Sequence, residues 1–348
     1  MYEYVGAIHI HSTFSDGSGD VKSIAQIADE VGLDYILLTD HNTLRALNEG
    51  FEGWYGKTLL LVGCEINDKE NKNHYLAFRI NKTYSTRLAA FEYVRKIKEE
   101  GGIGFIAHPH EKRSSMKEHP PYPWTEWSSE DFTGIEIWNH MSEWMEGLTE
   151  ENKYNYFMHP LKSIKAPNEQ TLRVWDRLNQ KRRVVGIGGV DAHAHKVNLL
   201  GFFEVEVFAY KVLFKSIRTH ILIDKKIEIP KNTRDIQTAK HLIYNALEKG
   251  NCFVSNFYHG DASGFRFFAE KGKKVYQMGE NIPLGKVSLR VLLPNIFGTI
   301  KLLRNGDVID SLNDFEAKFN IKEKGAYRVE VYLNDNAWIF SNHIRIGL

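Results

Sequence analysis

Residues 4–17 read Y-V-G-A-I-H-I-H-S-T-F-S-D-G, and the interpretation of the whole chain starts from this stretch. The apolar run before His9 predicts a buried strand that ends near two histidines. Because side chains alternate between the two faces of a strand, His9 and His11 point the same way. Asp16 follows in a loop rich in serine and glycine, which could fold back over the strand end.

The same arrangement recurs further along the chain. Residues 35–43 read Y-I-L-L-T-D-H-N-T, so a second apolar run ends at a carboxylate and a histidine. Polar residues of metal-binding types stand at the ends of six predicted strands: His9, His11, Asp40, His41, Glu65, His108, His140, Asp191 and His193. The strand ends of a parallel α/β barrel converge on one face, so these residues would meet in space. We therefore reject coincidence as the explanation.

Length and composition define the class of protein. The 348 residues can bury a full core and suggest more than one folding unit. The 45 Lys and Arg nearly balance the 44 Asp and Glu, which argues against binding of a nucleic-acid polymer. The chain opens on a predicted strand rather than a signal peptide, and its apolar runs are too short to span a bilayer. We expect a cytoplasmic protein with no membrane association.

Two architectures are predicted along the chain. Residues 1–260 alternate strands and helices, with helices expected over 20–31, 85–100 and 235–249, as in an α/β barrel. From residue 261 to 348 short strands and turns dominate, including an Asn-Gly turn, which predicts a small all-β sandwich domain. This second domain could bind a partner, cap the site or form the interface of a homo-oligomer.

The candidate ligands are imidazoles and carboxylates, which suit zinc, manganese or iron. A thiolate site is excluded by the cysteine count, because the chain has only two cysteines, Cys64 and Cys252. Eight or nine ligands exceed what one ion can use, so two or three metal ions are expected. Glu65 is the natural bridge between two of them. Such a cluster would lower the pKa of a bound water and clamp a phosphoryl oxygen.

The motifs together resemble those of the PHP (polymerase and histidinol phosphatase) superfamily over roughly residues 4–256. They are H-I-H-S at 9–12, S-D-G at 15–17, T-D-H-N at 39–42, G-C-E-I at 63–66, A-H-P at 107–109 and D-A-H at 191–193. The resemblance implies a distorted (β/α)7 TIM-like barrel that holds two or three metal ions. It also implies metal-dependent hydrolysis of a phosphoester.

The resemblance also implies a division of the ligands, which is carried over motif by motif. One metal site would comprise His9, His11, Glu65 and Asp191. A second site would comprise Asp16, His41 and His193. A third would use Glu65 and His108, with His140 as a further ligand whose surrounding I-W-N-H matches the family more loosely. All of these residues except His140 are the catalytic set that we expect.

The expected substrate is a small phosphorylated metabolite, such as a nucleotide or a sugar phosphate, as a mono- or diester. Candidate contacts to it are Arg45, His74, Lys112, Arg113 and Lys196, each of which could equally be a solvated or structural side chain. Alternatives that stay open are a histidinol-phosphate phosphatase, a C–N hydrolase that uses the same metals, and a non-catalytic metal- or carbohydrate-binding protein. The near-neutral charge argues against an exonuclease.

Overall fold

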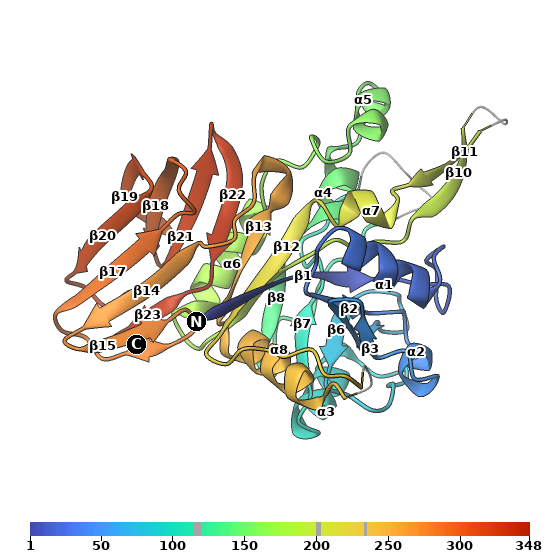
Figure 1. Ribbon diagram of the computed structural model, residues 1–348, viewed down its shortest axis with the longest axis horizontal. Coiled ribbons are helices and arrows are strands. Elements are labelled where there is room, and N and C mark those ends of the chain that lie inside the picture. Colours follow the sequence, from blue (N-terminus) through green and yellow to red (C-terminus); the bar gives the residue numbers. More distant parts are fainter. Residues whose placement is uncertain (114–119, 200–202, 233–234) are drawn as a thin grey trace.

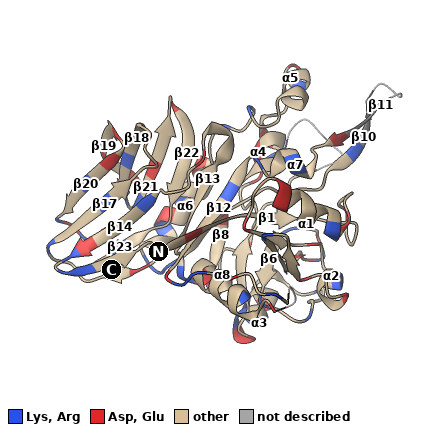
Figure 2. Cartoon of the chain, viewed as in Figure 1, with Lys and Arg blue, Asp and Glu red and all other residues tan. Residues whose placement is uncertain are grey.

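The computed structural model describes residues 1–113, 120–199, 203–232 and 235–348, which form a mixed α/β fold (Figure 1). None of the helices in these ranges is long and apolar enough to cross a membrane. The charged residues of both signs are interspersed along the chain in Figure 2, in keeping with the formal net charge of +1.

The N-terminal strand lies at the middle of a large sheet. β1 (Tyr2–Ile10) pairs in parallel with β2 (Tyr35–Leu38), and β2 pairs in parallel with β4 (Thr58–Val62). β3 (Gly53–Tyr55) closes this edge in the antiparallel direction. β2 and β4 are buried along their whole length, as parallel strands covered on both faces require. α1 (Val21–Glu30) packs against them. Its N-cap is Asp20, whose side chain accepts hydrogen bonds from two backbone N–H groups.

A second sheet of five strands carries the next part of the chain. Its order is β5 (Cys64–Ile66), β6 (Tyr75–Phe78), β7 (Ile103–Ile106), β8 (Gly134–Asn139) and β9 (Val185–Gly189). The first two pairings are antiparallel and the last two are parallel. The strictly alternating parallel pattern that the sequence predicted is therefore only partly present.

The predicted barrel is not confirmed, because the ring of strands is not closed. Between the two sheets, the described strands share single bridges, Ile10 with Ala192 and His41 with Glu65, instead of continuous ladders. The other edge of β1 is taken by β12 (Ile217–Ile223), which runs antiparallel and was not predicted. β12 pairs in turn with β13 (Cys252–Asn256), so the large sheet extends away from the ring.

The helices lie outside these sheets. The expected helices over 85–100 and 235–249 are observed as α3 (Ala90–Glu99), which packs on β7, and α8 (Gln237–Lys249), which packs on β12 and β9. The remaining helical elements are α2 (Arg45–Asn48), α4 (His140–Gly147), α5 (Lys153–Met158), α6 (Glu169–Asn179), α7 (Tyr210–Leu213) and the 3-10 turn η1 (Phe257–His259). β10 (His195–Leu199) and β11 (Phe203–Val207) form a hairpin that projects from the body in Figure 1.

Residues 261–348 contain strands and no helix, and all of them are described. One sheet has the order β15 (Lys274–Gln277), β14 (Arg266–Lys271), β17 (Val287–Leu292) and β20 (Glu316–Ile321). The others are β16 (Asn281–Ile282), β18 (Gly298–Arg304), β19 (Asp307–Asp314), β21 (Gly325–Leu333), β22 (Asn336–Ser341) and β23 (Ile344–Ile346). β17 alternates buried and half-buried residues, and its buried side chains join an apolar cluster with residues of β18, β21 and β22.

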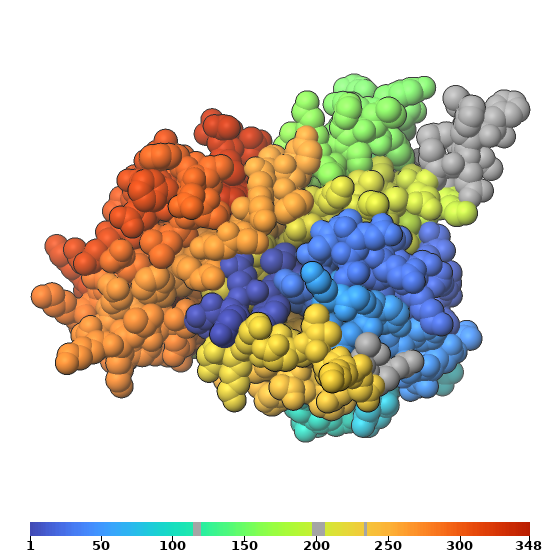
Figure 3. Space-filling model, viewed as in Figure 1, coloured from blue at the N-terminus to red at the C-terminus, as the bar shows by residue number. Residues whose placement is uncertain are grey.

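The C-terminal strands are joined to the N-terminal part by a shared ladder. β22 pairs with β13, so one sheet runs from β3 through β1 into the C-terminal strands. Figure 3 shows the N-terminal residues, in dark blue, packed among residues of the second half of the chain. Glu3 contacts both His220 (2.8 Å) and Arg266 (2.5 Å) there. A boundary between two domains near residue 260 therefore stays a prediction.

Candidate metal centre

The end of β1 places two histidines in the interior, at the seam between the two sheets. His9 and His11 are fully buried. The backbone N–H of His11 donates to the carbonyl of Ala192 (2.9 Å), which ties this strand end to the loop after β9. The register of β1 against β2 shifts between Ile8 and Ile10, so the two imidazoles are presented at an irregular strand end, as expected where a bulge redirects side chains.

Glu65, at the middle of β5, lies at the centre of the cluster. Its Oε2 is 3.0 Å from His9 Nε2, 3.1 Å from His11 Nε2 and 3.4 Å from His41 Nδ1. Its Oε1 is 2.7 Å from His74 Nδ1 and 3.4 Å from His108 Nε2. One buried carboxylate therefore faces five imidazoles, which come from the ends of β1, β6 and β7 and from the loop that follows β2.

Two aspartates complete the cluster, the buried Asp191 and the more exposed Asp16. Asp191 Oδ1 lies 3.3 Å from His9 Nε2, 3.6 Å from His11 Nε2 and 3.5 Å from His193 Nδ1. Asp16 Oδ1 lies 3.3 Å from His193 Nε2. The Asp16 side chain is about half exposed, whereas Glu65 is buried, so the cluster runs from a closed interior to an open rim.

The donor atoms gather into four overlapping groups, in each of which they lie within 4.8 Å of one another. The groups are His11, Asp16, His41 and His193; His9, Glu65 and His108; His9, His11 and Asp191; and His41, Glu65 and His74. We call these nine residues the metal centre. It contains eight of the nine ligands that the sequence indicated, and it adds His74, which was expected to contact substrate.

The buried nitrogens of the metal centre fit a divalent cation. Among the described residues, neither ring nitrogen of His11 has a hydrogen-bond partner, and the same is true of one nitrogen each of His74 and His108. A buried polar atom without a partner costs about 1–3 kcal/mol, so such atoms are rare unless they have another role. Coordination of an ion would satisfy one nitrogen of a ring, and imidazole with carboxylate is a donor set for zinc, manganese or iron.

The electrostatics of the metal centre keep its carboxylates ionised and divide its imidazoles. Burial opposes protonation of His9 and His108, but the neighbouring carboxylates outweigh it, so the pKa of His9 lies well above its usual value and that of His108 is raised to about 9. Burial, together with the neighbouring His193 and His41, lowers the pKa of His11 to about 3, so its imidazole is neutral at pH 7.

Burial opposes ionisation of Glu65, but the surrounding histidines outweigh it and hold the pKa of this carboxyl well below its usual range. The pKa of Asp191 is lowered in the same way, chiefly by His9 after burial is overcome. Metal ions bind the neutral imidazole and the ionised carboxylate.

Backbone strain also gathers at the metal centre. His9, His108 and Asp191 have φ angles of 69°, 27° and 53°, in the region that side chains with a Cβ rarely adopt. Each such residue costs on the order of 1–3 kcal/mol, and strain of this kind clusters at functional sites.

Glu136 is a functional residue that the sequence reasoning missed. It lies inside β8, where it is buried, and its Oε1 is 2.9 Å from His9 Nδ1. Its Oε2 accepts from the backbone N–H of His108 (2.8 Å) and from Asn139 Nδ2 (2.9 Å). With Nδ1 of His9 donating to this carboxylate, Nε2 is the nitrogen left to bind an ion. The available signal was a glutamate within the otherwise apolar run G-I-E-I-W.

Asp40 has a similar supporting role that was not assigned from the sequence. Its carboxylate accepts from the backbone N–H of Ser12 (2.7 Å), from the Ser12 hydroxyl (2.7 Å) and from the Ser15 hydroxyl (2.7 Å). These bonds fold the loop that carries Asp16 back over the end of β1.

His140 lies outside the four groups formed by the described residues. It is fully buried at the start of α4, and its Nδ1 lies 2.6 Å from the hydroxyl of Ser216. Burial lowers its pKa to about 3. The assignment of His140 to a third metal stays a prediction.

The expected substrate contacts other than His74 lie outside the nine residues of the metal centre. Arg45 pairs with Glu49 (2.6 Å), and Arg113 pairs with Glu111 and lies over the ring of Tyr122 at 5.2 Å. Tyr122 also stacks on His74, with ring centroids 5.0 Å apart. The exposed Lys112 follows His108 at the edge of a cavity, and the exposed Lys196 lies on β10.

Comparisons with known proteins agree with the sequence motifs. Residues 7–119 match the family model of the PHP domain, which confirms the predicted resemblance over this range. An uncharacterized protein of Methanocaldococcus jannaschii is 28% identical over 116 residues, which cover 30% of this chain and 66% of that relative, slightly less than two thirds of its length.

Three solved structures align with the chain at low identity and with TM-scores below 0.5. A two-domain protein of Bacteroides vulgatus, described as containing a predicted PHP-like metal-dependent phosphoesterase, is 15% identical with a TM-score of 0.44, and the alignment covers 98% of this chain and 95% of that one. A putative metal-dependent phosphoesterase of Bifidobacterium adolescentis is 17% identical over 58% of this chain and 92% of that one, with a TM-score of 0.35. An amidohydrolase of Chromobacterium violaceum is 14% identical over 54% of this chain and 87% of that one, with a TM-score of 0.34.

Proposed function

We propose that this protein is a metal-dependent phosphoesterase that hydrolyses the phosphate ester of a small metabolite, with two or three ions of zinc, manganese or iron. The observation that carries the proposal is Glu65, a buried carboxylate whose two oxygens face five imidazoles within 3.4 Å. A carboxylate in this position can bridge two cations. The match to the PHP domain supports the proposal, because its range includes Glu65 and all five of these histidines.

The residues of the chain prepare the metal centre for hydrolysis in three ways. Glu136 orients His9, and Asp40 holds the loop of Asp16, so the ligands are fixed before substrate arrives. Tyr122 covers His74 and limits the access of water from that side. Divalent ions held here would supply a Lewis acid for a phosphoryl oxygen and a water of lowered pKa.

The test is phosphate release from an aryl phosphate by protein loaded with manganese, zinc or iron. We expect release that stops on chelation and returns when the metal is restored. The variant Asp191→Asn, purified in the same way, should lose the activity and thereby excludes a contaminating phosphatase. Release that persists after chelation, or that is equal in the variant, would overturn the proposal.

A further inference from the structure

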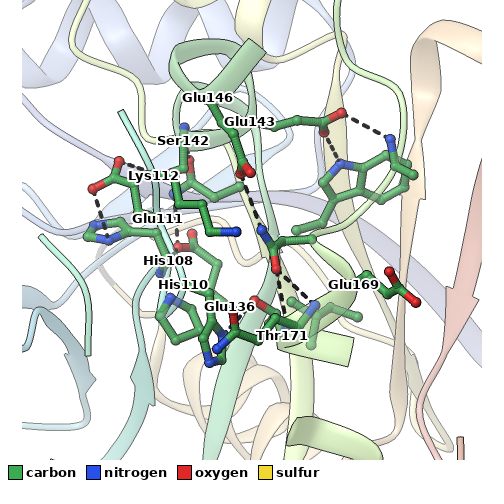
Figure 4. Close-up of a pocket in the computed structure, with 17 residues that line it drawn as sticks. His108, His110, Glu111, Lys112, Glu136, Ser142, Glu143, Glu146, Glu169 and Thr171 are labelled. Carbon is green, nitrogen blue, oxygen red and sulfur yellow. Dashed lines mark hydrogen bonds and ion pairs between the residues drawn. The ribbon is translucent and has the colours of Figure 1, made fainter. Parts of the chain in front are cut away.

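Two cavities differ in their relation to the metal centre. The cavity in Figure 4 is lined by His108 and Glu136, so it belongs to the site already described. A smaller cavity of about 130 Å³ lies at the other end of the parallel strands, at the amino ends of β1 and β2. Tyr4 lines it near the start of β1, whereas His9 lies near the end of the same strand, about 17 Å further along. The smaller cavity is therefore a separate site.

Most of the wall of this smaller cavity is apolar. Three aromatic and three isoleucine side chains line it, from β1, β2, β3, the segment after β12 and α8: Tyr4, Tyr35, Trp54, Ile227, Ile229 and Ile243. The Tyr4 hydroxyl accepts from the backbone N–H of Ile227 (2.6 Å). The Tyr35 hydroxyl donates to the carbonyl of Thr219 (2.9 Å), so both rings are left as apolar surface. An apolar cavity of about 150 Å³ accommodates a benzene ring, so this one is suited to a branched aliphatic group.

Two charged side chains of opposite sign also line this cavity. Asp34 precedes β2, and its Oδ2 accepts from the backbone N–H of Val5 (2.7 Å). Burial raises the pKa of Asp34, and this hydrogen bond offsets the effect only in part. Lys57, between β3 and β4, is exposed. Within the described chain, neither the Asp34 carboxylate nor the Lys57 ammonium group has an ion-pair partner within 4.0 Å.

A buried donor in the wall has no partner either. Trp54 is 8% exposed, and its indole Nε1 makes no hydrogen bond to any described residue. Such groups are uncommon in native proteins, and each calls for an explanation. The lining therefore combines an acidic group, a basic group and an unused N–H with an apolar interior.

We propose that this cavity binds a free α-amino acid with a branched aliphatic side chain, whose ammonium group pairs with Asp34 and whose carboxylate pairs with Lys57. The side chain then lies among the aromatic rings and the isoleucines. A zwitterion is complementary to both charges at once. A simple amine would leave Asp34 paired but bring a like charge near Lys57, and a simple carboxylic acid would do the reverse. No residue of the metal centre lines the cavity, so this inference does not rest on the hydrolytic function.

The test uses L-leucine and three compounds that each lack one of its groups. They are 4-methylpentanoate, which lacks the ammonium group, 3-methylbutylamine, which lacks the carboxylate, and glycine, which lacks the side chain. Each is titrated calorimetrically into the manganese-loaded protein. We expect each of the three to bind roughly tenfold more weakly than L-leucine or worse, because each loses a charge-assisted hydrogen bond or the burial of the aliphatic group.

Two variants should each remove one part of this preference. Asp34→Asn keeps an oxygen for the N–H of Val5 but removes the charge, so the preference for L-leucine over 4-methylpentanoate should largely disappear. Lys57→Gln should act in the same way on the preference for L-leucine over 3-methylbutylamine. The control is Lys225→Gln, at an exposed lysine that does not line the cavity, and it should keep both preferences.

The outcomes distinguish this site from the metal centre. An amino acid can also bind a metal ion, so the titration with L-leucine is repeated after chelation, and the affinity should not change. Binding that disappears on chelation would place L-leucine at the metal centre and overturn the proposal. The absence of binding at millimolar L-leucine, equal affinities for the four compounds, or preferences that survive Asp34→Asn and Lys57→Gln would also overturn it. The expected pattern would support the amino-acid site whether or not the protein hydrolyses an aryl phosphate.

Discussion

The molecule contains two buried clusters of charge, and they are balanced differently. We call the first the Asp176 cluster. In it, Asp176 of α6 accepts two hydrogen bonds from Arg328 of β21 (2.6 and 2.8 Å). His343 Nε2 lies 2.7 Å from the same carboxylate, and Arg328 also donates to Glu330 (2.6 Å). In the metal centre, the carboxylates face imidazoles, and several ring nitrogens have no hydrogen-bond partner among the described residues.

The difference indicates what each cluster is for. Arginine stays protonated in proteins, so Arg328 is a permanent cationic partner of Asp176. It also joins α6 to the C-terminal strands, and this role is structural. The metal centre has imidazoles as its only basic groups within ion-pair distance in the described chain, so its balance depends on protonation or on added cations. Buried charge that the chain does not balance by itself is the mark of a binding site.

The largest effect is expected for Glu65→Gln. The amide keeps the shape but removes the charge that faces five imidazoles, so metal-dependent kcat/KM should fall roughly 1,000-fold, which corresponds to several kcal/mol of lost stabilisation. Steady-state hydrolysis of an aryl phosphate measures the change. Glu49→Gln, at an exposed glutamate paired with Arg45, is the matched control and should keep its activity. A Glu65→Gln enzyme with more than a tenth of the wild-type kcat/KM would show that the charge of Glu65 is not needed.

Asp176→Asn should act on stability instead. The substitution leaves Arg328 buried without its bidentate partner, so the free energy of unfolding should fall by about 3–5 kcal/mol. Urea denaturation of the metal-free proteins measures it. Glu169→Gln, in an exposed ion pair on the same helix, should cost about 0–1 kcal/mol. If the loss at Asp176 were no larger than the loss at Glu169, the Asp176 cluster would not hold the two parts of the fold together.

A change of pH is expected to have a smaller effect on the free energy of unfolding. Burial opposes ionisation of Asp176, but Arg328 and His343 outweigh it and lower the pKa of this carboxyl in the folded protein. A lowered pKa means that the stabilisation is present above the unfolded pKa of about 3.9 and is lost as the pH falls below it. The difference in unfolding free energy between the wild type and Asp176→Asn should therefore be constant from pH 6 to about pH 4.5 and shrink toward pH 3. A difference that grows on acidification would contradict the assignment.

The metal centre was more predictable from the sequence than the path of the sheet. Histidines and carboxylates at the ends of apolar strands are a local signal, and strand ends converge whether or not the ring closes. β12 was missed because Arg218 and His220 interrupt its apolar residues. The structure accommodates both, since Arg218 lies 3.5 Å over the ring of Phe257 and His220 lies between Glu3 and Ser255. Partners that are distant in the sequence allow these two polar residues to lie in a buried strand, and the sequence around β12 does not show those partners.

The same reason explains the residues that were missed around the metal centre. Glu136 appears in sequence as one polar residue in a buried strand, and only its contact with His9, 127 positions away, gives it a role. Asp176 and Arg328 are 152 positions apart, so no local pattern connects them. Supporting residues are thus found when the fold brings distant segments together.

The most direct test of the account is the number of metal ions bound. Wild-type protein, Glu65→Gln and Glu49→Gln would each be dialysed against manganese, zinc and iron(II) in turn and then analysed for metal content. The account predicts two or three ions per chain in the wild type and in Glu49→Gln, and at least one fewer in Glu65→Gln. Fewer than one ion in the wild type with every metal, or the same number in Glu65→Gln as in the wild type, would contradict it.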